Sequence, residues 1–342
     1  MLPILLKKEK WKGSTFYLPL MRTLTRILLF TALVGYGLLD GAKAQSVSDT
    51  TKTSFPLPED SVLIIVKDSS ATAENAGLIH KSHFEAGMSY QSNDVYLGRK
   101  DSTVLPYYIP TFSYFHKSGL YATVSLNYLK NSTDSRIDLV TIEGGYMFTT
   151  GKYEGQFTAS KYFYNAQSTN VTSEISASLA YENSFDFGFI RPSFTGTLNI
   201  GNKLDFEGLF GVEHTFYFLA DKGDITPTFA FAGSTQNYYD AYYQNRKFNI
   251  KKLQKQQPNI SKITGSVLDA SAFKILDYEP TIPVNYRVGK CIFNFTPTYA
   301  IPVHPAEVSI QTTMTNGTVL NRTRIEKIEN TFYWTLGFTY QF

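Results

Sequence analysis

Hydrophobic and polar residues alternate at every second position along most of the chain after residue 79. The clearest case is the C-terminal segment TFYWTLGFTYQF. Its apolar face consists of Phe332, Trp334, Leu336, Phe338, Tyr340 and Phe342. Successive side chains of a β-strand point to opposite faces, so this period of two predicts strands with one apolar and one polar face.

The same alternation predicts about twelve strands of the length that a membrane requires. We place them at residues 80–90, 107–115, 120–129, 138–148, 153–163, 174–183, 187–200, 204–218, 225–234, 272–288, 291–301 and 331–342. Transmembrane strands need about 9 to 11 residues each, and bacterial barrels have an even number of strands. Residues 79–342 are therefore predicted to form an all-β, antiparallel transmembrane barrel.

The predicted connections alternate in length, as they do in such barrels, where periplasmic turns are short and extracellular loops are longer. The short set is 116–119, 149–152, 183–186, 220–224 and 289–290. The long set is 91–106, 130–137, 165–173, 234–271 and 302–330, and the exception is the short connection 201–203. An even number of strands then predicts that both ends of the mature chain are periplasmic.

The last strand resembles the closing strand of Gram-negative outer-membrane β-barrel proteins, which ends in a Phe that the barrel-insertion machinery reads. Phe342 matches that terminal position, and Phe338 and Tyr340 precede it on the same face. The resemblance implies a porin-like protein of the outer membrane, with membrane lipid and the insertion machinery as partners. It indicates no particular substrate.

A soluble β-sandwich or β-barrel would also give alternating strands. Composition favours the membrane: aromatic residues make up 15% of the chain, with 26 Phe and 24 Tyr, while the mean hydropathy is only −0.18. The aromatic face also continues around nearly every predicted strand, with Tyr near strand ends, as expected at bilayer interfaces.

The N-terminus has the pattern of a secretory signal peptide. Arg22 and Arg26 precede an apolar stretch from Ile27 to Leu39, and small residues follow at 42–44. The apolar stretch is short against the roughly 20 residues of a membrane-spanning helix. We therefore expect residues 1–44 to be removed, with Met21 as an alternative start of translation, and residues 45–78 to form a polar periplasmic leader.

Charge and cysteine content exclude several functions. Residues 1–44 hold seven Lys or Arg against two acidic residues, so their removal lowers the formal net charge from +3 to about −2. This balance argues against a nucleic-acid partner. The single cysteine, Cys291, excludes an internal disulfide and a clustered Cys metal site.

Many acidic residues fall on the face predicted to line the lumen. They are Glu85, Glu143, Glu154, Glu174, Glu182, Asp205, Glu207, Glu213, Asp277 and Glu279. Arg191 and Arg287 are the clearest basic residues on that face. Two interpretations remain open: a water-filled pore that favours cations, or a filled interior in which carboxylates pair with arginines. Twelve strands lie between filled and open barrels, so any pore should be narrow.

The 234–271 connection is the most distinctive loop. It carries Tyr238, Tyr239, Tyr242 and Tyr243, followed by Arg246 and Lys247. Such a loop could bind a glycan or a lipid phosphate, fold inward to constrict the pore, or remain solvated, because binding specificity often resides in loops.

No motif for catalysis or cofactor binding accompanies these features. The five histidines form no recognisable dyad with a nucleophile, and the sequence has neither a His-x-x-x-His motif nor a phosphate-binding Gly motif. We therefore expect no enzymatic activity, no metal and no cofactor. The leading hypothesis is a narrow passive channel or uptake component for small solutes; the alternative is a closed barrel with a surface-binding or structural role.

Overall fold

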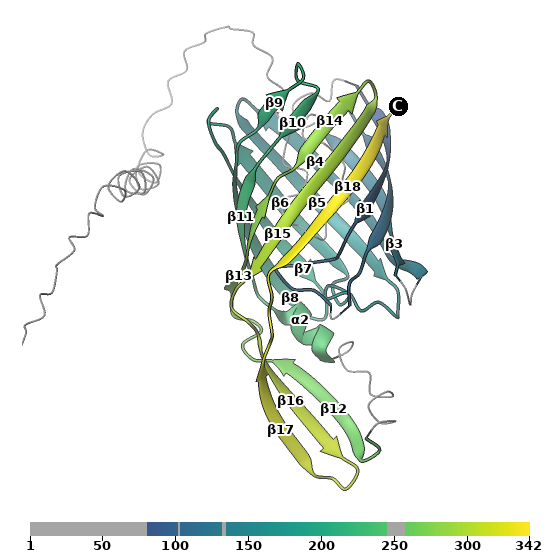
Figure 1. The fold of residues 1–342 in the computed structure, drawn as a ribbon, viewed down its shortest axis with the longest axis vertical. Helices are drawn as coiled ribbons and strands as arrows, with labels where there is room; N and C mark the ends of the chain where they lie inside the picture. Colours follow the sequence, from purple (N-terminus) through teal and green to yellow (C-terminus); the bar gives the residue numbers. More distant parts are fainter. Residues whose placement is uncertain (1–80, 102, 132–134, 245–256) are drawn as a thin grey trace, which may run out of the picture. The chain divides into compact units, whose positions relative to one another are not determined.

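The computed structural model describes residues 81–101, 103–131, 135–244 and 257–342 (Figure 1). The predicted signal peptide, residues 1–44, and the predicted leader, residues 45–78, lie outside the described residues. Arg246 and Lys247 also lie outside them.

Twelve antiparallel strands close into a barrel, which confirms the predicted fold class. The barrel is made of β1 (His83–Gln91), β2 (Tyr107–Phe115), β3 (Leu120–Lys130), β4 (Ser135–Thr150), β5 (Tyr153–Tyr164), β6 (Ala177–Phe185), β7 (Arg191–Ile200), β8 (Leu204–Glu213), β11 (Thr228–Ser234), β13 (Lys274–Thr281), β15 (Cys291–Pro302) and β18 (Thr331–Gln341). Each strand pairs with the next, and β18 pairs with β1 to complete the ring. Three short strands prolong members of the ring: β9 (Phe216–Phe218), β10 (Gly223–Ile225) and β14 (Val284–Val288).

The two faces of the wall are inverted relative to a soluble barrel. On β3, the outward Val124 is 45% exposed while its inward neighbour Thr123 is only 3% exposed. Inward hydroxyl groups bond to each other across strands, as Ser113 and Thr123 do at 2.9 Å. A soluble protein would bury its apolar face, so an apolar exterior around a polar interior identifies a transmembrane barrel.

Connections at the two ends of the barrel differ in length, as predicted. One end has short turns, such as residues 151–152 between β4 and β5, and the other has long connections, such as 92–106 and 165–176. The turn between β2 and β3 needs glycine, because Gly119 has a φ of +93° and an added Cβ would lie 2.1 Å from the Met147 oxygen. The described N-terminal end of the wall and the C-terminus both lie at the short-turn end, where the Phe342 amide bonds to the Phe84 oxygen.

The two longest connections contain structure that the alternation did not predict. They hold α2 (Asn237–Tyr242), β12 (Ile260–Val267), β16 (Glu307–Met314) and β17 (Val319–Ile325). The last three strands pair in the order β12-β16-β17, separately from the barrel, and we call them the external sheet (Figure 1). Among the described residues, no helix is long and apolar enough to cross a membrane.

Candidate functional site

The residues predicted to line the lumen lie on the inward face of the barrel wall. Those buried are Glu85, Glu143, Glu154, Arg191, Glu207, Glu213, Asp277 and Glu279, whereas Arg287 is half-buried. Glu182 is also half-buried, and Asp205 is buried. Glu174 lies in the turn before β6 rather than on the wall, because β6 begins three residues later than predicted.

An ion-pair cluster occupies the wall near the short turns. Arg191 on β7 bonds to Glu154 on β5, and its Nε lies 3.6 Å from Glu213 Oε1 on β8. The same Nε donates to Ser184 Oγ at 3.0 Å. One arginine therefore compensates two carboxylates, which reduces the cost of burying them.

Other inward carboxylates have no such compensation. Within the described part of the chain, Glu182, Glu207 and Asp277 form no ion pair. Asp277 is fully buried, and neither of its carboxylate oxygens has a hydrogen-bond partner there. An isolated ionised carboxylate is costly in a dry interior, so these groups need water, a cation or a proton.

The loop between β1 and β2, residues 92–106, crosses the barrel at the long-loop end. Its Tyr96 hydroxyl donates to Glu207 Oε2 at 2.5 Å and accepts from Asn199 Nδ2 at 3.0 Å. Asn199 and Glu207 lie on β7 and β8, six positions around the twelve-strand ring from β1 and β2. The loop therefore joins opposite sides of the wall.

A tight turn forms the tip of loop 92–106. Tyr96 and Arg99 exchange two backbone hydrogen bonds around Leu97 and Gly98, which have φ values of +49° and +71°. An added Cβ at Gly98 would lie 2.6 Å from Pro302 Cβ and 3.1 Å from Asp277 Cγ. The tip thus packs directly against Asp277 of β13 and Pro302 at the end of β15, where only glycine fits.

The Arg99 side chain bonds loop 92–106 to the segment before α2 and to the segment after β17. Its guanidinium donates to Gln236 Oε1 at 3.0 Å and to Glu326 Oε2 at 3.3 Å, and it lies 5.1 Å from the centre of the Tyr239 ring. Glu326 follows β17 and also accepts a hydrogen bond from the Ala306 amide at 3.1 Å. Loop 92–106, α2 and the base of the external sheet are therefore held by one buried arginine.

Asp205 fixes α2 at the barrel end. Its carboxylate accepts the backbone amides of Asn237 and Tyr238, both at 2.7 Å, and the Thr235 hydroxyl at 2.6 Å. The first amides of a helix lack intrahelical partners, so a carboxylate there stabilises the helix start. The predicted lumen residue Asp205 thus acts as a helix cap.

The tyrosines predicted as loop-binding residues are packed inward. Tyr238, Tyr239 and Tyr242 are 2–3% exposed, and Tyr243 is half-buried. Tyr238 packs edge-on against Tyr96, with ring centres 5.1 Å apart. These buried rings do not present an open binding surface in this structure.

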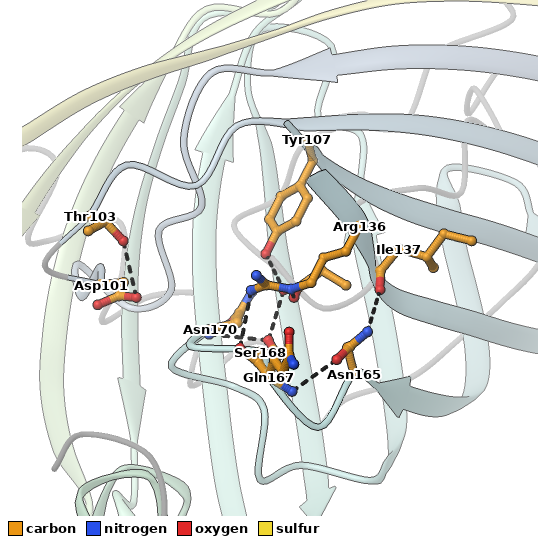
Figure 2. Close-up of polar contacts among 10 residues, drawn as sticks. Asp101, Thr103, Tyr107, Arg136, Ile137, Asn165, Gln167, Ser168 and Asn170 are labelled. Carbon is orange, nitrogen blue, oxygen red and sulfur yellow. Dashed lines mark hydrogen bonds and ion pairs between the residues drawn. The ribbon is translucent and has the colours of Figure 1, made fainter. Parts of the chain in front are cut away.

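A second polar network holds the neighbouring long loop (Figure 2). Asp138 accepts hydrogen bonds from Tyr107 at 2.7 Å, Ser168 at 2.8 Å and Arg136 at 2.8 Å. Asn170 in turn donates to Asp94 Oδ2 at 2.8 Å, so loop 165–176 and loop 92–106 bind each other.

An apolar cluster fills the space between these loops and the wall, and we call it the mouth core. Its members are Tyr96, Leu97, Leu139, Tyr162, Val171, Ile175, Leu209, Ala230, Ala232, Tyr238, Tyr239, Tyr242, Val267, Ala270, Leu276, Ala306 and Val308. Because these residues come from both loops, α2, the wall and the external sheet, a packed core joins these elements at the long-loop end of the barrel.

Burial affects the tyrosine hydroxyls of the mouth. Burial raises the pKa of Tyr96 well above its ordinary value, and the Glu207 carboxylate raises this pKa further. Burial and the Glu326 carboxylate also raise the pKa of Tyr239 well above its ordinary value. Both hydroxyls therefore stay protonated and serve as donors.

Sequence reasoning did not identify the inward folding of loop 92–106. The available signal was Val95-Tyr96-Leu97, an apolar triplet inside a polar connection. Such a triplet is costly in a solvated loop, and all three residues are fully buried.

The C-terminal aromatic residues face outward. Phe338 is 39% exposed and Phe342 61% exposed, while Tyr340 is half-buried and pairs with Ala86 of β1 and Cys291 of β15. They therefore belong to the apolar outer face of the seam where the barrel closes.

No family model and no curated protein matches the sequence. Among solved structures, KdgM porin is similar at 8% identity over 75% of this chain and 99% of that chain, with a TM-score of 0.38. NanC porin has 9% identity over 75% and 98%, with a TM-score of 0.39. The outer membrane channel DcaP of Acinetobacter baumannii has 8% identity over 77% and 96%, with a TM-score of 0.28. With scores below 0.5, these likenesses support no inference about function.

Proposed function

We propose that the chain is a narrow outer-membrane channel for small solutes, closed at its long-loop mouth by loop 92–106. The observation that carries this proposal is the excess of carboxylates on the inward face, including Glu182, Glu207 and Asp277, which form no ion pair within the described residues. Glu207 and Asp277 are buried beneath loop 92–106, but Glu182 is only half-buried, and water in the lumen would solvate it, whereas a dry, filled barrel would have to neutralise it.

Partial exposure of Glu182 supports a wet interior. Its side chain lies on the inward face of β6, beside the buried Ala180 and Ser184, and yet it is not fully buried. Acidic walls around water raise the local cation concentration, so the channel should prefer cations.

Passage through such a channel requires loop 92–106 to move. The loop is held by a few buried polar contacts at Tyr96 and Arg99 and by the mouth core. A gate of this kind would open when those contacts break, while the wall strands keep their pairing.

The proposal also covers which end of the barrel faces the periplasm and which residues direct its insertion into the membrane. We infer that the short-turn end and both mature termini face the periplasm, because this side of outer-membrane barrels has short turns. Phe338, Tyr340 and Phe342 are proposed to be the signal that the insertion machinery reads.

A second candidate function is a closed barrel with a surface-binding or structural role. The mouth core favours it, since Tyr96 and Leu97 are fully buried and span the bore. The two candidates differ in whether the mouth ever opens.

Ion conductance across a planar bilayer tests the proposal. Refolded mature protein should give small, cation-preferring conductance steps with a low open fraction. Replacing residues 95–99 by Gly-Ser-Gly should raise the open fraction, because it removes the crossing tip. The matched control is the same replacement at residues 315–318, the turn between β16 and β17, which should change nothing. Silence of wild type and tip variant, with the barrel folded, would establish the closed-barrel alternative; a preference for anions would contradict the acidic lumen.

A further inference from the structure

The external sheet has two edges, and they differ in how they are covered. At the β12 edge, α2 packs against the strand, and the Val267 amide donates to Asp240 Oδ1 of α2 at 2.9 Å. At the other edge, β17 pairs only with β16 among the described residues, and all seven of its residues are exposed. One side of β17 therefore presents backbone groups without a neighbouring strand.

The side chains of β17 combine cationic and apolar character. Arg322 and Arg324 lie on the same face of the strand and form no ion pair in the described part of the chain. Leu320 is 54% exposed and Ile325 68% exposed. Charged residues on an edge strand ordinarily discourage pairing. Large exposed apolar residues on the same strand serve no such purpose.

A second copy of the chain is a poor partner for this edge. Antiparallel pairing of β17 with itself over its full length, residues 319–325, is centred on residue 322 and places the two Arg322 side chains opposite each other. Like charges directly opposite are destabilising. A strand with carboxylates at the matching positions is complementary instead.

Backbone hydrogen bonds and one buried side chain hold the external sheet in place in the absence of a partner. The Glu326 amide donates to the Ala306 oxygen at 2.8 Å, and the Leu268 amide donates to the Glu307 oxygen at 2.8 Å. Val308 of β16 is 2% exposed within the mouth core. A preorganised edge loses little conformational entropy on binding.

We propose that β17 is a docking edge for an extended acidic segment of a partner protein, which adds to the external sheet as a fourth strand. Main-chain hydrogen bonds would supply affinity, as in other cases of strand addition. Carboxylates two residues apart would face Arg322 and Arg324, and the apolar residues that alternate with them would lie beside Ile325 on the other face.

Fluorescence anisotropy with mature protein in detergent micelles tests this proposal. The probe is a fluorescein-labelled, amidated peptide Thr-Val-Glu-Val-Glu-Val-Thr. We expect saturable binding, and loss of it when alternate amides of the peptide are N-methylated, because N-methylation removes main-chain donors and leaves the charge unchanged. Arg322→Glu should weaken binding about tenfold, whereas the matched charge reversal Lys262→Glu on β12 should leave it unchanged.

Three outcomes would overturn the proposal. Absence of saturable binding would exclude an acidic strand as the partner. Equal binding of the N-methylated peptide, with displacement of both peptides by dextran sulfate, would indicate a simple polyanion surface. Dimerisation of peptide-free protein in analytical ultracentrifugation that Arg322→Glu abolishes would assign the edge to a second copy.

Discussion

The substitution Tyr96→Phe removes one hydroxyl from the loop that crosses the mouth. The ring keeps its packing against Tyr238, but Glu207 loses the donor at 2.5 Å. A hydrogen bond to a charged group contributes about 1.5 to 3 kcal/mol. Asn199 Nδ2 still donates to the same carboxylate oxygen at 3.2 Å, so the lower end of that range applies. About 1.4 kcal/mol corresponds to a tenfold change in an equilibrium, so the ratio of closed to open mouth should fall about tenfold.

Single-channel recording in planar bilayers measures this ratio as the open fraction. Tyr96→Phe should raise the open fraction about tenfold and leave the current of each open channel unchanged, because the wall strands are untouched. Tyr333→Phe is the matched control. It also removes a tyrosine–carboxylate bond, to Glu279 at 3.1 Å, but between the wall strands β18 and β13.

Two results would refute this reasoning. If Tyr96→Phe leaves the open fraction at the wild-type level, loop 92–106 does not control the mouth. If Tyr333→Phe raises the open fraction equally, the effect reports general loosening of the barrel wall rather than release of the loop. Thermal unfolding of both variants shows whether the two losses destabilise the fold comparably.

Other substitutions test separate parts of the account. Gly98→Val should displace the loop tip from Pro302 and raise the open fraction; unchanged gating would mean that the tip tolerates a side chain. Glu182→Gln should reduce cation preference in reversal-potential measurements, most at low salt, where screening is weak; an equal preference at low salt would remove Glu182 from the permeation path. Deleting Phe342 should lower the amount of heat-modifiable protein in the outer membrane, and normal assembly would contradict the insertion signal.

The barrel could be predicted from the sequence because its physical cause is local. Each wall strand meets lipid on one face and the lumen on the other, so apolar and polar residues alternate along every strand. The predicted strand 107–115 has the same bounds as β2. The predicted strands that begin at residues 174 and 187 start too early, because the alternation of apolar and polar residues continues through the turns before β6 and β7.

The contacts of loop 92–106 and the external sheet could not be predicted in the same way. Tyr96 meets Glu207, and Arg99 meets Glu326, through contacts that no local pattern encodes. β17, with the sequence VLNRTRI, is exposed at every residue, so it has no alternation to reveal it. Inward placement of Asp205 followed from alternation, but its role as a cap depends on a helix that forms 32 residues later in the chain.

The contacts of the mouth join residues that are far apart in the chain, and this separation affects when they form during biogenesis. Tyr96 and Glu207 are 111 residues apart in the chain, and Arg99 and Glu326 are 227 residues apart. Glu326 precedes β18, the strand that closes the ring against β1. Contacts between residues so distant in sequence form late, after the closure entropy of the intervening chain has been overcome. Glu85 and Gln341, which pair where β1 meets β18, are 256 residues apart, so closing the ring and joining the mouth are both late events of folding.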